Sequence, residues 1–508
     1  MIEIKLYSKE CYGNPFLDVD VFAEFTSPNG QKYTVQGFFN GDHWIVRFKP
    51  NMAGGWGYKT YSNVINGDFI SSGQVHVELP IKKGFLRAIP NKNWGLWFDS
   101  DEEFLLFGDT QYNLFGVAHC GVDIRPILAR RKLQGFNFLR TRIQVSPFHP
   151  GSPTSSWQNK STWLWGGSPQ MPDYTRFNVE YFETVESVLN MVQEMGFGLE
   201  VILEAWLMEM PFNDRGRFLP EHEELFFKYV IARLACFPGI YMWCVANEYN
   251  LYTSNINDSL ATKYALRLAK LIKQSDCYQH PVAVHVTMAE NMNLPFMNHF
   301  RSSTDVDVLL LQYWGDISSQ RSSKLCAKLE HEIRRSVIGS DKVNVMSEYG
   351  YEVFEGTGLS PEIHNGLGPD HTRRGAWRSL FSGVHLICGF ENTWGPVFTL
   401  ENEPKGAEQL IHLKNLFTEH FNFGDFKPDY DFSEDNSWPE GEQPLCLSSK
   451  THVLIYLPTG KACKLKIEEF RSAQWYATQT GVFSECKEFV SPPNEGLEEM
   501  DWVLVLEK

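Results

Sequence analysis

The chain has 508 residues, 43% of them hydrophobic and 21% charged, which is an ordinary globular composition with enough length for two to four domains. Its formal net charge of −16, without clustered lysine or arginine, argues against nucleic acid as a partner, because tracking phosphates requires clustered cations. No apolar run reaches the roughly 18–20 residues of a membrane helix, and the N-terminus lacks a signal-peptide pattern. We therefore expect a cytoplasmic protein with no membrane partner.

Residues 1–85 contain short stretches in which apolar and polar residues alternate. Leu17, Val19 and Val21 alternate with polar neighbours, and Asn-Gly turns follow at Asn29-Gly30 and Asn40-Gly41. Period-two runs separated by such turns are typical of antiparallel strands. The sequence therefore predicts a small immunoglobulin-like β-sandwich.

From residue 86 to 422, apolar runs alternate with amphipathic helical stretches. Near-continuous apolar runs are typical of parallel strands covered on both faces, and eight are found: Phe104–Phe107, Phe136–Ile143, Gly198–Glu204, Ile240–Ala246, Pro281–His285, Val308–Gln312, Val343–Met346 and Gly389–Glu391. Helices are predicted between them, with the fifth poorly marked: Pro126–Gln134, Tyr181–Met195, Glu221–Phe237, Asp258–Ser275, Leu325–Gly339, His371–Ser382 and Glu408–Phe417. Eight such repeats predict a (β/α)8 barrel, and no GxGxxG or P-loop follows the first strand to favour a nucleotide-binding fold.

Residues 423–508 begin with an acidic stretch rich in proline and glycine and continue with alternating runs such as Thr451–Tyr456 and Trp502–Leu506. These runs predict a second β-sandwich. The expected fold is thus of the α/β class, a TIM barrel flanked by two small all-β sandwich domains, and a homo-oligomer is possible.

Two glutamates follow predicted barrel strands directly. Glu248 comes after the fourth strand in Ala246-Asn247-Glu248, and Glu348 comes after the seventh in Ser347-Glu348-Tyr349. Working groups of such barrels lie at the C-terminal ends of the strands, and a carboxylate placed there after apolar residues must be hydrogen-bonded or functional. Two facing carboxylic acids suit glycoside hydrolysis, in which one acts as acid/base and the other as nucleophile. The alternative is that one or both only form ion pairs at the rim.

These segments resemble the large retaining clan of cellulases, mannanases and β-galactosidases. The resemblance implies that Glu248 is the acid/base and Glu348 the nucleophile. Gly135-Phe136-Asn137-Phe138-Leu139-Arg140 is similar to that clan's second strand, so Arg140 would keep Glu348 ionised, because a nearby cation stabilises a carboxylate. The same resemblance implies that Asn247 hydrogen-bonds the sugar 2-hydroxyl and that Tyr313 contacts the nucleophile.

A closer resemblance covers nearly the whole chain. Phe107-Gly108-Asp109-Thr110, Pro172–Asn178 and Phe390–Trp394 look like the apiosidase-like barrel family, whose members often carry an N-terminal immunoglobulin-like domain and a C-terminal sandwich named "putative collagen-binding". Members of that family differ in substrate. The resemblance therefore supports the mechanism more than it identifies the sugar.

Further strand-end residues are candidates for substrate binding. The resemblance makes Trp394 an aromatic platform for the sugar, since aromatic faces stack on sugar C–H groups. Asp109 either binds a sugar hydroxyl or caps the next turn, and a lone histidine such as His285 is most often a satisfied core residue. Trp206 and Glu391 complete the set of candidates. The long loop from Gln144 to Arg176 contains Trp157, Trp163 and Trp165, which either serve function or form a satellite cluster under the loop.

The sequence thus predicts a retaining glycoside hydrolase for β-linked oligosaccharides or glycosides. No metal or organic cofactor is expected, since the ten cysteines lack metal-binding spacing and suit reduced thiols. The alternatives are a furanosidase of the apiosidase or arabinofuranosidase type, an inverting enzyme, and a non-catalytic carbohydrate-binding barrel. Spare carboxylates near the predicted rim leave the acid/base assignment open: Glu209, Asp214, Asp316, Glu352 and Glu355.

Overall fold

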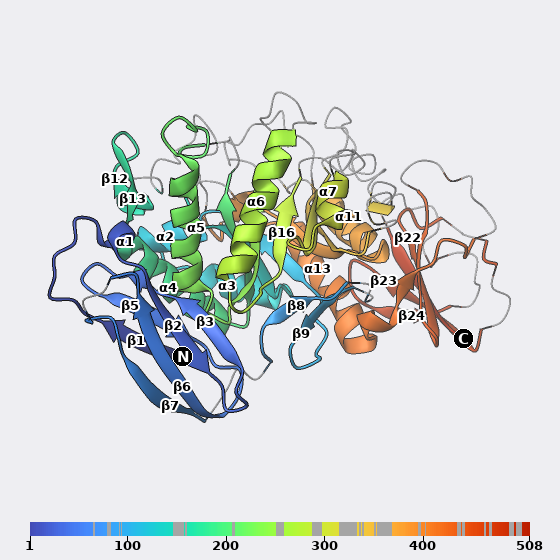
Figure 1. Ribbon diagram of the computed structural model, residues 1–508. Helices are drawn as coiled ribbons and strands as arrows, with labels where there is room; N and C mark the ends of the chain where they lie inside the picture. The colour runs from blue at the N-terminus through green and yellow to red at the C-terminus, as the bar shows by residue number, and fades with distance from the viewer. Residues whose placement is uncertain are drawn as a thin grey trace.

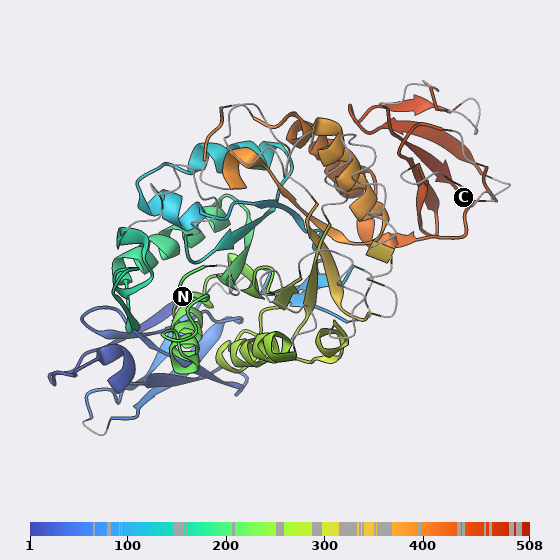
Figure 2. The same ribbon diagram turned by 90° about the horizontal axis from the view of Figure 1, so that it is seen from above.

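The computed structural model has a closed barrel of eight parallel strands between two antiparallel β regions (Figure 1). Figure 2 shows the N-terminal sheets and the C-terminal sheet on opposite sides of the barrel. The structure describes residues 1–64, 67–78, 83–90, 92, 94–145, 157, 160–205, 209–249, 259–286, 297–313, 333–334, 337, 340–349, 352, 368–394, 398–401, 403–433, 438, 442–461, 464–466, 470–486, 492–493 and 500–508. Within these ranges, no helix is long and apolar enough to cross a membrane.

The N-terminal region is a sandwich of two antiparallel sheets, as predicted, but the run from Leu17 to Val21 is not a strand: Leu17 lies in the short helix α1 (Pro15–Asp18), and the strand begins only at Val21. One sheet has three strands, β1 (Ile2–Leu6), β5 (Trp44–Phe48) and β4 (Phe38–Phe39), and the other has four, β3 (Lys32–Gln36), β2 (Val21–Thr26), β6 (Gly54–Ser62) and β7 (Ser72–Val77). Phe25 of one sheet stacks on Phe48 of the other at 4.5 Å between ring centroids. Gly30 and Gly41 have positive φ, as the predicted Asn-Gly turns require.

The barrel strands pair in chain order around a packed interior. They are β10 (Phe107–Thr110), β11 (Phe138–Arg142), β14 (Gly198–Glu204), β15 (Ile240–Ala246), β16 (Val282–His285), β17 (Val308–Gln312), β18 (Val343–Glu348) and β19 (His385–Gly389). Phe138, Ile202 and Leu310 lie in the interior core, whereas Leu139 and Val201 belong to the core under the helices. The hairpin of β8 (Leu86–Ala88) and β9 (Leu96–Phe98) adds Leu86, Leu96 and Phe98 to the interior core.

Two predicted strand positions were wrong. The first strand is β10 rather than Phe104–Phe107, because the Phe104 amide bonds to the Leu96 carbonyl at 2.9 Å and the Phe104 ring packs with the hairpin of β8 and β9. The eighth strand is β19 rather than Gly389–Glu391. It begins at a buried histidine, His385, whose ring nitrogens contact the Leu106 amide and the Trp94 carbonyl. Because this first residue is polar, a search for apolar runs does not find the start of the strand.

Six described helices agree with predicted ones to within three residues at either end: α3 (Arg125–Leu133), α4 (Val179–Glu194), α5 (Pro220–Leu234), α6 (Ser259–Ser275), α11 (Pro369–Phe381) and α13 (Lys405–Asn415). Three short helices were not predicted: α2 (Leu114–His119), α7 (Met297–Ser302) and α12 (Glu391–Trp394). In α4, the Asn178 side chain caps the first turn, and Phe182, Val185 and Leu189 repeat on the buried face. Most of the predicted helix Leu325–Gly339 lies outside the described residues.

The long loop after β11 contains a short hairpin of β12 (Trp165–Gly167) and β13 (Pro172–Phe177). Trp163 and Trp165 are buried there, and the Trp165 ring contacts Tyr174, Phe218 and Phe226, among others. These two tryptophans therefore form the satellite cluster that was one of the two expectations for the loop.

The described C-terminal residues form one six-stranded antiparallel sheet, so the predicted second layer of a sandwich is not found within them. Its strands, in order, are β20 (Lys427–Pro428), β21 (Leu445–Ser448), β22 (His452–Leu457), β25 (Trp502–Glu507), β23 (Ser472–Ala477) and β24 (Phe483–Glu485). One face packs on α11, where Trp377 stacks on Tyr456 at 5.8 Å. The sheet thus uses the barrel itself as its packing partner.

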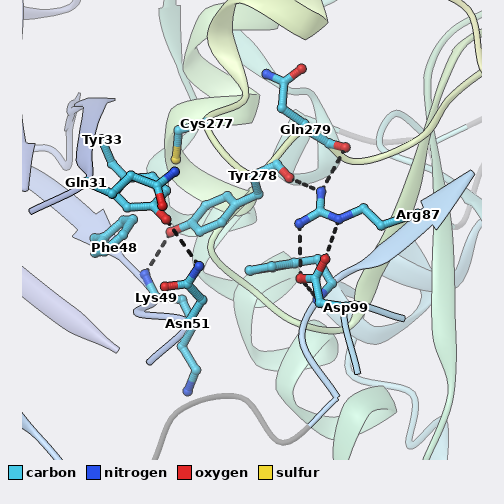
Figure 3. Close-up of a pocket in the computed structure, with 11 residues that line it drawn as sticks. Gln31, Tyr33, Phe48, Lys49, Asn51, Arg87, Asp99, Cys277, Tyr278 and Gln279 are labelled. Atoms are coloured by element: carbon cyan, nitrogen blue, oxygen red, sulfur yellow. Dashed lines mark hydrogen bonds and ion pairs between the residues drawn. The ribbon is translucent and has the colours of Figure 1, made fainter. Parts of the chain in front are cut away.

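The seam between the N-terminal sheets and the barrel holds a cavity of about 340 Å³ (Figure 3). Tyr278, which precedes β16, accepts a hydrogen bond from the Lys49 amide at 2.7 Å and lies against Phe48. Arg87 pairs with Asp99 and donates to the carbonyl of Tyr278. This cavity lies at the N-terminal ends of the barrel strands. Since the chemistry of such barrels is at the opposite ends, we assign it to domain packing.

We expect Asp501→Asn to loosen the C-terminal sheet from the barrel. Both Asp501 and Arg373 of α11 are fully buried, and Arg373 donates to Asp501 Oδ1 from two nitrogens at 2.6 and 2.8 Å. Arg373 also pairs with the partly exposed Asp370 at 2.6 Å, so removing the Asp501 charge leaves the buried guanidinium only partly compensated, which costs about 3 kcal/mol. Differential scanning calorimetry should show a Tm lowered by several degrees. Asp431→Asn, which breaks an exposed pair with Lys466, is the control and should leave Tm unchanged; equal effects of the two variants would contradict the assignment.

Candidate active site

The two predicted glutamates lie at the C-terminal ends of the fourth and seventh barrel strands, β15 and β18. A register shift brings Glu348 to its place: Leu311 pairs with Met346, but Gln312 pairs with Glu348, so Ser347 is an extra residue. Val345 faces the interior, and strict alternation would turn Glu348 outward. The bulge reverses that direction, which is a common use of bulges beside active sites.

The Glu348 carboxylate is buried and accepts three hydrogen bonds from described side chains. Arg140 Nη1 donates to Oε1 at 2.6 Å, and the Tyr112 hydroxyl donates to the same oxygen at 2.7 Å. Gln312 Nε2 donates to Oε2 at 3.0 Å. Charge-assisted bonds of this length stabilise the ionised carboxylate. Glu348 is therefore held in one orientation.

Arg140 lies at the centre of the site and is fully buried. Besides Glu348, its guanidinium donates to Asn247 Oδ1, to His285 Nδ1 at 2.8 Å and to Glu200 Oε1 at 3.3 Å. Glu200 lies deeper in the barrel, and burial raises the pKa of its carboxyl against the opposing effect of Arg140. A planar guanidinium with five donors can bond several partners at once, so Arg140 fixes the relative positions of these groups.

Asn247 connects the two glutamates. Its Oδ1 accepts from Arg140 and lies 3.2 Å from the Tyr112 hydroxyl, while its Nδ2 donates to Glu248 Oε2 at 3.2 Å. Glu248 is buried, with 9% of its surface exposed, and has φ of +45°, a left-handed conformation that is rare outside glycine. Such conformations persist where the surroundings enforce them, often at functional sites.

His285 contacts this group from the end of the fifth strand. Its Nδ1 accepts from Arg140, and the Glu248 amide lies 3.4 Å from the same nitrogen. Burial and then the charge of Arg140 hold the pKa of the ring well below its ordinary value. The ring is therefore neutral, and its Nδ1 lies within hydrogen-bond distance of Arg140, of Asn247 Oδ1 and of the Glu248 amide. Glu248, Glu348, Asn247, Arg140 and His285 are thus brought together.

Tyr313 and Asp109 are placed differently. The Tyr313 main-chain amide donates to the Glu348 carbonyl at 2.8 Å, and the hydroxyl that donates to the Glu348 carboxylate belongs to Tyr112. Asp109 lies within β10 and bonds Arg131 of α3 at 2.7 Å in a fully buried ion pair on the helix side of the barrel. The structure therefore does not bring Asp109 to the two glutamates, because the strand is three residues later than predicted.

The candidates of the eighth strand are only partly described. Glu391 begins α12 and is buried. Trp394 ends that helix, but its side chain is outside the described part of the structure, as is the whole of Trp206. The roles of Glu391, Trp394 and Trp206 in substrate binding therefore stay predictions.

Most of the spare carboxylates have structural partners. Glu209 contacts Arg142, Asp214 bonds Arg217, and Glu352 accepts hydrogen bonds from the Gly406 amide and the Thr372 hydroxyl. Asp316 and Glu355 lie outside the described residues. Among the described carboxylates, Glu248 and Glu348 remain the pair joined through Asn247 and Tyr112.

Three site residues were missed at the sequence level: Tyr112, Gln312 and Glu200. Glu200 and Gln312 lie within predicted strands, at positions that face the interior of the barrel, and a polar residue on that face was the available signal. Tyr112 follows β10 by two residues. Its position at the barrel mouth was hidden by the misplaced first strand.

Glu391 should make the stability of the protein depend on pH. Burial raises the pKa of its carboxyl to about 8, against about 4.3 for an unfolded glutamate. The folded state therefore retains a proton that the unfolded chain releases, and this stabilising contribution, complete below about pH 4, is lost as the pH rises to 8. Tm measurements from pH 5 to 8 should show Glu391→Gln gaining on the wild type as the pH rises. Exposed Glu401→Gln is the control. If the Tm difference from the wild type stays constant with pH for both variants, the prediction is contradicted.

Among the described residues, no group of three or more histidine, cysteine, aspartate or glutamate side chains could hold a metal ion.

The closed parallel barrel and the match to a family of catalytic domains place the chain in the class of the glycoside hydrolases. Residues 95–421 match the family described as "Apiosidase-like, catalytic domain", and the chain belongs to this family. Residues 1–63 match a domain of unknown function termed DUF5060, and residues 428–507 match the "Putative collagen-binding domain of a collagenase". No curated protein matches the sequence.

Solved structures share the fold at low sequence identity. A "putative glycoside hydrolase" from Bacteroides vulgatus is 17% identical, with a TM-score of 0.71 over 100% of this chain and 98% of that one. A glycoside hydrolase of family 5 from the same organism is 14% identical, with a TM-score of 0.62 over 85% of this chain and 95% of that one. These likenesses support the barrel and its flanking β regions.

Proposed function

We propose that the protein is a retaining glycoside hydrolase that cleaves β-linked oligosaccharides or glycosides, with Glu348 as nucleophile and Glu248 as acid/base. The observation that carries the proposal is the Glu348 carboxylate held by Arg140, Tyr112 and Gln312, and joined through Asn247 to Glu248. Two carboxyl groups across the mouth of a barrel suit a double displacement.

In the first step, Glu348 attacks the anomeric carbon while Glu248 protonates the leaving oxygen. In the second step, Glu248 takes a proton from water, which displaces Glu348 from the sugar. Arg140 counters the charge of Glu348 whenever the carboxylate is free. We propose that Asn247 Nδ2 bonds the sugar 2-hydroxyl when substrate is present, and that Trp394, Trp206 and Glu391 line the substrate site.

We place this activity in the cytoplasm and favour small glycosides as substrates. Among the described cysteines, Cys11, Cys236, Cys244, Cys277 and Cys388 are free thiols, and three of these five are buried. Unpaired thiols in this number suit a reducing compartment, where soluble oligosaccharides are more accessible than insoluble polymers.

A furanoside is the second candidate substrate, because the family to which the barrel belongs is named for apiosidase. Pyranosides and furanosides both place an anomeric carbon between two carboxyl groups. The described side chains bond the nucleophile and the acid/base, and they would serve either ring form.

A panel of 4-nitrophenyl glycosides tests the proposal: glucoside, galactoside, mannoside and xyloside of β configuration, β-apiofuranoside and α-L-arabinofuranoside. At least one should release 4-nitrophenol, with the activity lost in Glu348→Gln and reduced in Glu248→Gln. Sugar binding without hydrolysis of any member would favour a carbohydrate-binding barrel. Hydrolysis unaffected by both substitutions would overturn the assignment of the two glutamates.

A further inference from the structure

We propose that Tyr112 is a positioning residue that determines which oxygen of Glu348 attacks the sugar, an inference that rests on the proposed function. Oε2 would form the bond to the anomeric carbon, and Oε1 would become the carbonyl oxygen of the glycosyl ester. Tyr112 comes from the turn after the first strand, far in sequence from both glutamates. Its hydroxyl nevertheless reaches Glu348 Oε1 at 2.7 Å.

The two oxygens of Glu348 differ in how many of their lone pairs are used. Each carboxylate oxygen has two lone-pair sites. Oε1 accepts from both Arg140 and Tyr112, at 2.6 and 2.7 Å, so both of its sites are taken. In the described part of the chain, Oε2 accepts only from Gln312, at the longer distance of 3.0 Å. Oε2 therefore keeps a lone pair for bond formation.

The surroundings of Tyr112 maintain this difference. The side chain is buried, and the Arg140 guanidinium lies 5.3 Å from its ring centroid and donates to its hydroxyl at 3.0 Å. Burial, opposed by Arg140 and reinforced by Glu348 and Glu248, raises the pKa of Tyr112 well above its ordinary value. The hydroxyl therefore keeps its single proton as a donor. With Arg140 donating to it, that proton is directed to Glu348 Oε1 at 2.7 Å rather than to Asn247 Oδ1 at 3.2 Å.

The bond changes follow from this arrangement. A lone pair of Oε2 forms the bond to the anomeric carbon, and the bond from that carbon to the leaving oxygen breaks with its electron pair on the oxygen, which takes the proton of Glu248. In the return step, a water oxygen bonds to the anomeric carbon, Glu248 takes the water proton, and the electron pair of the ester bond returns to Oε2. Tyr112 and Arg140 stay on Oε1 throughout and stabilise the carboxylate charge at both ends of the cycle.

Tyr112→Phe tests the role of the hydroxyl, with Tyr181→Phe as matched control. Tyr181 is also buried, and its hydroxyl donates to the Ile143 carbonyl at 3.0 Å rather than to Glu348. On the 4-nitrophenyl glycoside cleaved fastest by the wild type, Tyr112→Phe should lower kcat/KM about 10- to 100-fold. It should also move the acidic limb of the pH profile to higher pH, since the anion of Glu348 loses a donor. Tyr181→Phe should change neither by more than about twofold. Equal behaviour of the two variants would overturn the proposal.

A crystal structure of the enzyme trapped with a 2-deoxy-2-fluoroglycosyl fluoride of the same sugar tests the choice of oxygen. We expect the ester bond through the oxygen nearer Gln312, with the Tyr112 hydroxyl on the carbonyl oxygen. An ester through the oxygen bonded to Tyr112 would overturn the inference and leave the proposed function intact. If the wild type hydrolyses no glycoside, or does so without Glu348, the proposed function itself fails.

Discussion

Glu348→Gln should lower kcat/KM for the best aryl glycoside by about 10⁴-fold or more, which is the scale of loss when a nucleophile is removed. Glutamine has the size of glutamate and can still accept from Arg140 and Tyr112, so the site should keep its shape. It lacks the charge and the nucleophilic oxygen of the carboxylate. Initial rates under kcat/KM conditions, with circular dichroism to confirm folding, measure the effect.

Glu352→Gln is the control for this substitution. Glu352 is also buried, but it accepts hydrogen bonds from the Gly406 amide and the Thr372 hydroxyl. Among the described residues, it does not bond any side chain that bonds Glu348, and its substitution should change kcat/KM by less than about tenfold. A loss in Glu352→Gln as large as in Glu348→Gln would mean that Glu348 has no special role.

Arg140→Lys should have the second largest effect, a loss of about 10³-fold in kcat/KM, although the charge is conserved. Arg140 bonds Glu348, Asn247, His285 and Glu200 from one planar group. A lysine ammonium is a compact charge on a flexible stem and cannot reproduce this fork. The freed carboxylates would take up protons more readily, so the acidic limb of the pH profile should also move to higher pH.

Arg130→Lys provides the comparison for Arg140→Lys. Arg130 lies on α3, is 39% exposed and pairs with the partly exposed Glu408. Exposed pairs contribute little to stability, so this variant should retain wild-type kcat/KM and pH profile. Should Arg140→Lys match it in both measurements, the central position assigned to Arg140 would be wrong.

The sequence predicted the barrel and both strand-end glutamates, because apolar runs and amphipathic helices carry the fold in local patterns. Its first and last strands were misplaced for opposite reasons. Phe104 and Leu106 pack beneath the barrel with β8 and β9, and β19 begins at a polar histidine whose partners, Leu106 and Trp94, are far away in sequence. Local hydrophobicity gives no information about either arrangement.

The candidate site was partly predictable for a similar reason. Glu248, Asn247, Glu348 and Arg140 lie in motifs that identify them, whereas Tyr112 acts through contacts made only when strand one meets strands four and seven. The bulge at Ser347, which turns Glu348 inward, depends on the register between β17 and β18. Pairing registers between distant segments are not encoded in any single stretch of sequence.

The stereochemistry of the first product tests the central claim most directly. Proton NMR recorded during the first minutes of hydrolysis of a β-configured aryl glycoside distinguishes the two anomers before they equilibrate. Double displacement at Glu348 predicts that the β anomer is released first. Initial release of the α anomer would show direct attack by water, and Glu348 would then be the base of an inverting enzyme rather than its nucleophile.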